Sequence, residues 1–387
     1  MGGPGKLADL GNVTEGTNSY LLQAAAGSPA ILVDTTQPNT ADEYTRVLME
    51  HLEKKGRPPV EHIVMTHRHI DHIGGIAPVL RALQAQGYPK PKVWKMVSPD
   101  EAKLQANARD SIHTDKTLID SVKACEGAYQ PTESGEQVWE LNGGDRISVT
   151  SGDKKLDAVV VPTPGHTADS ISILIEPSDG QDGPTVLTGD TVLGQGTTIF
   201  TDFAAYMKSL KTLYDLKPSV LYPAHGPAIV GRQECDDHLA AYIKHRQDRE
   251  DTIVEEFKKI AANPGIIGKQ LDEIRHAEAE KHKPEGDPTA PAAPLAKASL
   301  AEVPDFAALF PGPNDEGASA VTLPLLCRLI YKSGHQPLIM AAMRTITAHI
   351  EKLEGEGRVK KVTVPLPRIM GWTVEGTEPT EAYEWVR

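Results

Sequence analysis

The segment Thr66–Gly75 holds the densest group of side chains that can do chemistry. It reads THRHIDHIGG, so three imidazoles and one carboxylate fall within six residues. Neutral imidazole and carboxylate groups suit zinc and related first-row metal ions. In an extended segment residues i and i+2 point to the same side, so His67 and His69 can share one ion. Asp71 and His72 then turn into a helix, where they can serve a second ion.

An apolar strand is predicted directly before this segment, at residues 63–65. Open α/β sheets place their sites on the loops at the carboxyl ends of strands, which is where this polar cluster would lie. A solvated polar loop is the alternative interpretation. The spacing HxHxDH, set between a strand and Gly-Gly, favours a metal site over that alternative.

Three further strand ends each present one side chain that can bind a metal. Short apolar runs lead into His166 after Thr-Pro-Gly, into Asp190 after Gly, and into His225 after Pro-Ala. Each residue alone would be an ordinary turn residue, since Pro and Gly are typical of tight turns. Four ligand-bearing strand ends in one chain are hard to explain as turns alone. They predict one shared site at the edge of a sheet.

Strands and helices are predicted to alternate along the first two thirds of the chain. The apolar pattern predicts strands at 17–22, 30–34, 63–65, 147–150, 156–161, 171–175, 185–188 and 220–222. It predicts helices at 41–55, where Thr40–Glu43 resembles a capping box, through about residue 85, and at 204–216. This alternation is typical of a layered α/β fold. Residues 98–135 fit the pattern poorly and are interpreted as an insertion over the core.

Length and composition indicate a globular protein with room for two domains. The chain has 387 residues, of which 39% are hydrophobic and 24% charged, ordinary values for a globular protein. No apolar run approaches the roughly 18 residues that a membrane span needs, so no membrane partner is predicted. The formal net charge of −13 disfavours broad binding to nucleic acid backbones, which requires a basic surface.

The cysteines and the N-terminal residues bear on the compartment. Cys125, Cys235 and Cys327 lie far apart and form neither a zinc-ribbon spacing nor a disulfide framework. The first residues show neither an apolar signal-peptide core nor an arginine-rich transit pattern. We therefore expect a reducing compartment. The cytoplasm is the expected location, with the mitochondrion as the alternative.

Taken together, the motifs resemble the metallo-β-lactamase superfamily. Within it they are most similar to the lactamase beta 2-like branch, which includes fungal polyketide-releasing thioesterases. The similarity spans roughly residues 16–250 and returns at about 325–362. The motifs that carry it are GTNSYL at 16–21, THRHIDH at 66–72, TPGHT at 163–167, GDTVLGQGTT at 189–198, YMKSL at 206–210, YPAHGP at 222–227 and HRQDRE at 245–250.

This resemblance implies an α/β fold, the metallo-β-lactamase αββα sandwich followed by a small winged-helix domain. We expect a hydrolase domain at 1–250, a helix and Pro/Ala-rich linker at 251–324, and a winged-helix-like domain at 325–387. The linker composition is typical of a flexible segment. In the last domain, the run from Ala348 to Val359 looks like the helix and wing.

The resemblance also implies a site for two Zn²⁺ ions, or for other divalent metals in their place. One ion would be held by His67, His69 and His166, and the other by Asp71, His72 and His225, with Asp190 bridging the two. A metal-activated hydroxide would attack an acyl or phosphoryl centre, and Asp71 would act as the catalytic residue by orienting that water or moving its proton. The GxSxG motif of serine hydrolases is absent from the sequence.

The sequence departs from the family pattern next to two of the histidine motifs. Relatives usually carry Trp where this chain has Arg68, and Asp-Asp-His where it has Ala168-Asp169-Ser170. The histidine that is missing at Ser170 would support a metal ligand, so we expect its absence to loosen the orientation of that ligand.

Three functions are weighed on this basis. The first is hydrolysis of an ester or thioester in fungal-type secondary metabolism, with a small-molecule or carrier-protein-bound acyl substrate. The acidic charge balance and the fungal-type motifs favour it. The second is an endoribonuclease cleaving single-stranded RNA, for which the winged helix offers only Lys352, Arg358, Lys360 and Lys361. A scaffold that keeps metal only for stability is the least compatible with a complete ligand set.

Overall fold

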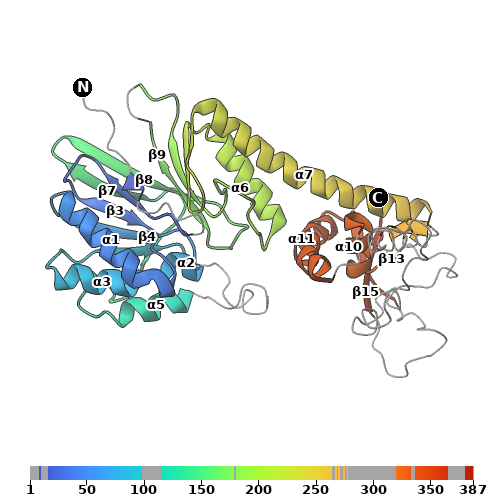
Figure 1. The fold of residues 1–387 in the computed structure, drawn as a ribbon, viewed down its shortest axis with the longest axis horizontal. Helices are drawn as coiled ribbons and strands as arrows, with labels where there is room; N and C mark the ends of the chain where they lie inside the picture. Colours follow the sequence, from blue (N-terminus) through green and yellow to red (C-terminus); the bar gives the residue numbers. More distant parts are fainter. Residues whose placement is uncertain are drawn as a thin grey trace, which may run out of the picture. The chain divides into compact units, whose positions relative to one another are not determined.

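The structure is a computed structural model that describes residues 8–9, 16–97, 115–177, 180–263, a few positions between 266 and 277, 320–332, 336–364 and 380–386. Its contacts divide the chain into two compact units, Met1–Lys244 and His245–Arg387. Figure 1 shows both units coloured along the sequence. Each unit has its own hydrophobic core.

The first sheet of the first unit has six strands in chain order. Neighbours β1, β2 and β3 pair antiparallel, whereas β3, β4, β5 and β6 pair parallel. The parallel part sends several strand ends to one edge, as the sequence predicted for the histidine motif. The strands are β1 (Ala8–Asp9), β2 (Tyr20–Gln23), β3 (Ala30–Val33), β4 (Val60–Met65), β5 (Lys92–Lys95) and β6 (Trp139–Glu140).

The second sheet of this unit also has six strands, in the order β12-β11-β10-β9-β8-β7. Its pairs are antiparallel except for β10 and β11, which run parallel and so end at the same edge. The strands are β7 (Arg146–Ser151), β8 (Lys154–Pro162), β9 (Ile171–Ile175), β10 (Thr185–Gly189), β11 (Val220–Pro223) and β12 (Ile229–Val230).

The two sheets enclose one core, and the first sheet has a second core on its other face. Because side chains alternate along a strand, β2 sends Tyr20 and Leu22 into the core between the sheets and Leu21 to the opposite side. Val149 and Val160 of the second sheet complete the core between the sheets. Burial on both faces explains the nearly continuous apolar runs of these strands.

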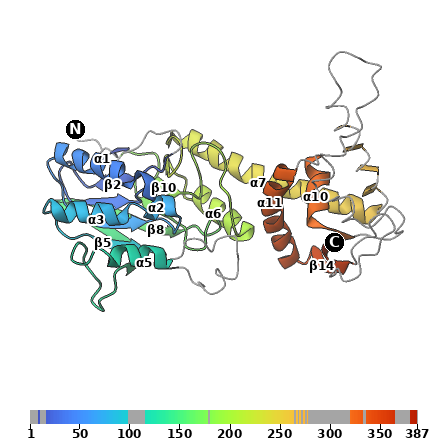
Figure 2. The same cartoon turned by 60° about the horizontal axis from the view of Figure 1, so that its bottom comes forward.

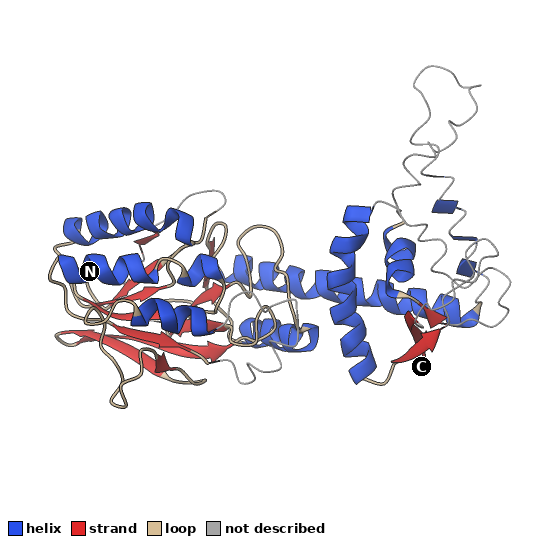
Figure 3. Cartoon of the chain, turned by 90° about the horizontal axis from the view of Figure 1, so that it is seen from below, coloured by secondary structure: helices blue, strands red, loops and turns tan. Residues whose placement is uncertain are grey.

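Helices α1 (Ala41–Lys54), α3 (Ile76–Ala85) and α5 (Asp115–Lys123) cover the outer face of the first sheet (Figures 1 and 2). The layering of helices over strands is visible in Figure 3. The helix expected through about residue 85 is two helices, α2 (Ile70–Ile73) and α3, separated by Gly74 and Gly75. A Cβ at Gly74 would lie 2.5 Å from Pro38 Cδ, so this close approach requires glycine.

The capping box expected for this helical layer is wrong. Thr40 does not cap α1: its Oγ1 lies 2.8 Å from Thr36 Oγ1 and donates to Gln37 O at 3.3 Å. The reason is the 3-10 turn at Pro38–Thr40, which runs directly into the helix. In the segment interpreted as an insertion over the core, α5 packs on the outer face of the first sheet, where Leu118 is buried. Residues 98–114 of the expected insertion lie outside the described residues.

Helix α6 (Phe203–Asp215) is anchored on the loops that follow the strands of the second sheet. Asp202 caps its N-terminus by accepting from Ala205 N at 2.9 Å. Tyr206 OH donates to Thr191 O at 2.8 Å, and Ser209 Oγ donates to Pro164 O at 2.7 Å. The long helix α7 (Arg232–Ala262) begins in this unit, and its later residues belong to the second.

The second unit combines helices with a small sheet ordered β13-β15-β14. Its elements after α7 are β13 (Ala320–Val321), α10 (Leu323–Tyr331), α11 (Gln336–Gly355), β14 (Val359–Val364) and β15 (Thr380–Trp385). Ile253 and Phe257 of α7 pack with Leu326 and Ile350 in its core. The helix expected to open the linker at 251 is therefore part of this unit's core.

Two further sequence expectations bear on the remaining segments. Within the described part of the chain, none of the helices is both long and apolar enough to cross a bilayer. The Pro/Ala-rich stretch expected to form the linker lies, from 278 to 319, outside the described residues.

Candidate metal centre

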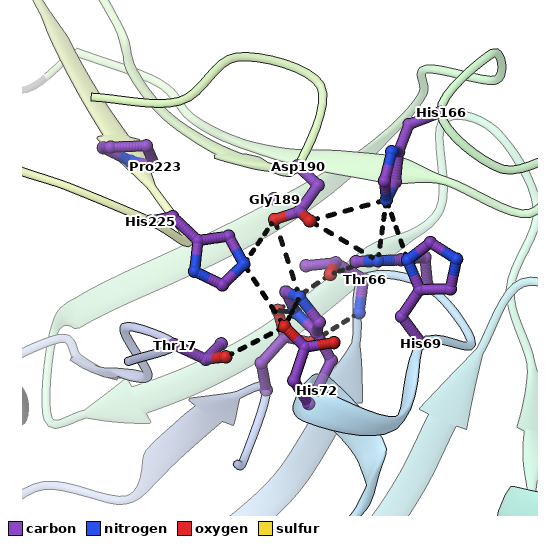
Figure 4. A network of polar contacts seen from close by, with 12 residues as sticks. Thr17, Thr66, His69, His72, His166, Gly189, Asp190, Pro223 and His225 are labelled. Atoms are coloured by element: carbon purple, nitrogen blue, oxygen red, sulfur yellow. Dashed lines mark hydrogen bonds and ion pairs between the residues drawn. The ribbon is translucent and has the colours of Figure 1, made fainter. Parts of the chain in front are cut away.

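The structure brings all seven predicted ligand side chains together at one edge of the two sheets (Figure 4). They come from the loop after β4, from α2, and from the loops after β8, β10 and β11. Their ligand atoms form two groups, each with all atoms within 4.8 Å of one another. The first group is His67, His69, His166 and Asp190, and the second is Asp71, His72 and His225.

In the first group three ring nitrogens face a common point. His166 Nε2 lies 2.9 Å from His69 Nδ1 and 3.2 Å from His67 Nε2. Nitrogens bound to a tetrahedral zinc ion at about 2.0–2.1 Å would lie about 3.3 Å apart, close to these separations. Asp190 Oδ2 adds an oxygen 3.4 Å from His166 Nε2. The group thus has the donor types and the spacing for one small cation.

Asp190 turns its other carboxylate oxygen toward the second group. Its Oδ1 lies 3.5 Å from His72 Nε2 and 3.3 Å from His225 Nε2. Asp71 Oδ2 lies at the same 3.5 Å and 3.3 Å from these two nitrogens. One carboxylate therefore presents one oxygen to each group, which is the geometry of a bridging ligand.

Two buried atoms at the centre test whether these residues fit a cation. His72 Nε2 and Asp190 Oδ1 are buried and have no hydrogen-bond partner within the described residues. Buried polar atoms nearly always have a hydrogen-bond partner, so the absence of one at these two atoms needs an explanation. A divalent ion would accept the lone pairs of both atoms. Nitrogen and carboxylate donors in this ratio suit zinc and similar first-row metals.

The protonation states of the two groups differ. Burial lowers the pKa of His67 well below its usual value and also lowers that of His166, so both rings are neutral and can donate a lone pair. Burial opposes protonation at His225 too, but the nearby carboxylates of Asp190 and Asp71 outweigh it and raise the pKa of His225 to about 10. A metal in the second group would displace this proton.

Asp34 supports the second group and was missed as a site residue in the sequence. Its carboxylate accepts from Thr66 N and Thr66 Oγ1, each at 2.7 Å, and lies 2.9 Å from His72 Nδ1. A carboxylate on one ring nitrogen fixes the tautomer that leaves the other nitrogen free for a metal. The available signal was the polar Asp-Thr-Thr at the end of β3, the same edge as the histidine motif.

Backbone carbonyls orient the two remaining histidine loops. His166 Nδ1 lies 2.6 Å from Ile199 O, and His225 Nδ1 lies 3.3 Å from Gly16 O. In both rings a proton on Nδ1 can be donated to the carbonyl, which leaves Nε2 to face the centre. Thr17, next to Gly16, donates from Oγ1 to Asp71 Oδ2 at 3.3 Å.

Gly165, next to His166, is expected to tolerate no side chain. Its φ is +132°, and a Cβ there would lie 2.4 Å from Tyr206 Cα and N. Gly165→Ala must move the His166 loop away from α6 and should lower stability by more than the roughly 1–2 kcal/mol of a left-handed backbone alone. Thermal unfolding measures this loss.

The matched control for this prediction is Gly196→Ala. Gly196 has a φ of +79° but nothing within 4 Å of an added Cβ, so it carries the backbone cost without the clash. Equal losses of stability in the two variants would contradict the close packing of Gly165 on Tyr206.

Comparisons with known families decide the assignment of the fold. The model of the metallo-beta-lactamase superfamily matches residues 13–225. The chain belongs to the metallo-beta-lactamase superfamily. A beta-lactamase associated winged helix domain matches residues 322–364, in the second unit. The family resemblance inferred from the sequence motifs is thereby confirmed, and it places the chain among metal-dependent hydrolases.

Individual relatives agree with this assignment. A beta-lactamase-like protein 2 homolog of Caenorhabditis elegans is 33% identical over 245 residues, which cover 63% of this chain and 66% of the relative. The thioesterase pkgB of Emericella nidulans is 30% identical over 241 residues, covering 62% of this chain and 53% of its own length. These matches thus span only about half to two thirds of each relative.

A solved structure extends the likeness in fold over both units. A metallo-beta-lactamase family protein from Thermus thermophilus aligns with a TM-score of 0.52 at 17% identity, covering 96% of this chain and 94% of that one. At this identity the likeness shows the fold alone.

Proposed function

We propose that this superfamily member is a binuclear, zinc-dependent hydrolase of esters or thioesters. The observation that carries the proposal is the placement of Asp190, with one carboxylate oxygen facing each group of ligands. A single ion would need only one of these groups. The thioesterase among the relatives supports an acyl substrate, either a small molecule or one bound to a carrier protein.

Bound between these ligands, two divalent ions would lower the pKa of a water molecule and polarise the substrate carbonyl. Asp71 is placed to orient that water and to hold its proton, because its side chain is 33% exposed and reaches both the second group and solvent. Thr17 fixes one of its oxygens by donating to Oδ2. We therefore assign Asp71 the catalytic proton-handling role in addition to its place in the second group of ligands, and the other six residues the role of ligands alone.

Ion pairs in the second unit weaken the alternative of an RNA-cleaving enzyme. The four basic residues that the sequence offered for RNA binding lie against carboxylates within that unit: Lys352 with Glu250 and Glu356, Arg358 with Glu356, Lys360 with Glu384 and Lys361 with Glu381. Binding to nucleic acid needs cations that are available to phosphates. The wing therefore offers RNA little net positive charge.

A side-by-side assay tests the proposal. Zinc-loaded protein is given a panel of acyl thioesters and, separately, an end-labelled single-stranded RNA. We expect release of free thiol from at least one thioester and no cutting of the RNA. The thiol assay suits this chain, because Cys125, Cys235 and Cys327 are all buried and contribute little background.

His166→Ala serves as the control for contamination, since it removes a ligand of the first group. Cleavage of RNA that His166→Ala abolishes, together with no turnover of any ester or thioester, would replace the proposal by the endoribonuclease alternative. Protein that binds no zinc at all would reject both functions.

A further inference from the structure

Four buried ionic side chains form a cluster behind the first group of ligands. Arg68, Lys95 and Asp169 expose only 2%, 1% and 0% of their surface, and Asp115 exposes 6%. Lys95 Nζ donates to the Asp169 carboxylate and, at 2.8 Å, to Met96 O, and it lies 2.7 Å from Asp115 Oδ1. Arg68 Nη1 lies 3.6 Å from Asp169 Oδ1. Two cations thus face two anions.

Such a cluster contributes less to the stability of a core than its number of ion pairs suggests. Removing charges from water costs several kcal/mol per ion, and apolar residues of similar size often serve stability equally well. Burial raises the pKa of Asp169, but Lys95 and Arg68 together outweigh it and hold that pKa below its usual value, so the carboxylate stays ionised. Stability alone therefore does not explain why these four charged side chains are buried at this position.

That position joins the two loops that supply the first group of ligands. Arg68 lies between His67 and His69, and because side chains alternate along an extended segment it points away from them. Asp169 lies three residues after His166, in the loop that joins β8 to β9 of the second sheet. The same two loops share a backbone hydrogen bond from Ile171 N to Thr66 O at 3.0 Å.

Lys95 and Asp115 complete the cluster from the helical side of the first sheet. Lys95 is the last residue of β5, and Asp115 is the first residue of α5. The cluster therefore links four segments that are far apart in the sequence. The histidines of the second group are held by other partners: Asp34 contacts His72, and Gly16 O contacts His225.

We propose that the Arg68–Asp169 pair, supported by Lys95, is a positioning device that holds the His67/His69 loop and the His166 loop at the separation one metal ion needs. This inference rests on the proposed metal-binding function. It predicts selectivity: weakening the pair should lower the affinity of the first group for metal and leave that of the second group unchanged. A purely structural role would affect both groups alike.

The test measures Zn²⁺ affinity by competition with a chromophoric chelator in two backgrounds. Asp71→Ala/His225→Ala leaves the first group intact, and His67→Ala/His166→Ala leaves the second. Arg68→Gln removes the cation, and Arg68→Lys retains it. We expect Arg68→Gln to weaken zinc binding about tenfold or more in the first background, with partial rescue by Arg68→Lys, and to change it less than twofold in the second.

Lys116→Gln is the matched control, because it removes an exposed ion pair with Asp120 on the same helix as Asp115. Near-ultraviolet circular dichroism verifies folding, and Asp169→Asn, which keeps the side-chain shape, replaces Arg68→Gln if that variant does not fold. Equal losses in the two backgrounds, or no loss in the first, would overturn the inference. Absence of zinc binding in the unmodified chain would instead overturn the proposed function.

Discussion

Asp190→Asn is expected to lower kcat on an acyl substrate by about a hundredfold or more, as for loss of one strong electrostatic element of a catalytic site. The change keeps the shape of the side chain and removes the charge that faces both ligand groups. Without it, two nearby cations repel each other with little compensation. Elemental analysis after dialysis should show less than two ions per chain, and steady-state kinetics should show the fall in kcat.

The fold should survive this substitution, because the loop is held by contacts that do not involve the carboxylate. Thr198 Oγ1 donates to the backbone oxygen of Asp190 at 2.6 Å. Asp215→Asn is the matched control, since Asp215 lies on the exposed side of α6 in an ion pair with Lys211. Full metal content and near-normal hydrolysis in Asp190→Asn would reduce the site to His67, His69 and His166 alone.

The positions of the candidate ligands could be predicted from the sequence because each one follows a strand. An apolar strand followed by a polar turn can be read locally, and the edge where parallel strands end is a general property of such sheets. The structure brings the seven candidate ligands together from four strand ends, as that reasoning required. Periodicity also located α1 and α6, since their buried positions recur at helical spacing.

Contacts between distant residues could not be predicted in this way. In the sequence Arg68 is only a departure from the family pattern, and nothing near it indicates that the Asp169 carboxylate faces its charge or that Lys95 pairs with the same carboxylate. The same holds for α7, where Ile253 and Phe257 are buried by helices that follow roughly 70 to 100 residues later. Burial by partners that are remote in sequence is decided by tertiary packing, and no local pattern encodes it.

Asp34 illustrates a role that only the geometry reveals. It has a φ of 58°, a conformation in which Asp and Asn are tolerated better than most residues. Its position after β3 was visible in the sequence, but the partner that gives it a role, His72, lies 38 residues further on.

Asp34→Asn is expected to weaken zinc binding by the second group about ten- to a hundredfold, the usual effect of losing a supporting partner of a metal ligand. In the unmodified chain both carboxylate oxygens accept hydrogen bonds. Oδ1 accepts from Thr66 N, and Oδ2 accepts from Thr66 Oγ1 and lies 2.9 Å from His72 Nδ1. An amide has only one accepting atom. If its oxygen faces Thr66 N, its NH₂ faces His72 Nδ1 and favours the tautomer with the proton on Nε2, the atom that a metal needs.

The opposite orientation of the amide sets its NH₂ against Thr66 N–H, so two donors meet in a buried site, where an unmade hydrogen bond costs about 1–3 kcal/mol. Either orientation therefore penalises the second group. Zinc titration in the His67→Ala/His166→Ala background measures the effect on that group alone. Tyr44→Phe is the matched control, because Tyr44 OH contacts Ser19 in the same corner, 2.6 Å from its Oγ, without touching the carboxylate. Unchanged affinity in Asp34→Asn would show that the tautomer of His72 is fixed by the metal itself rather than by Asp34.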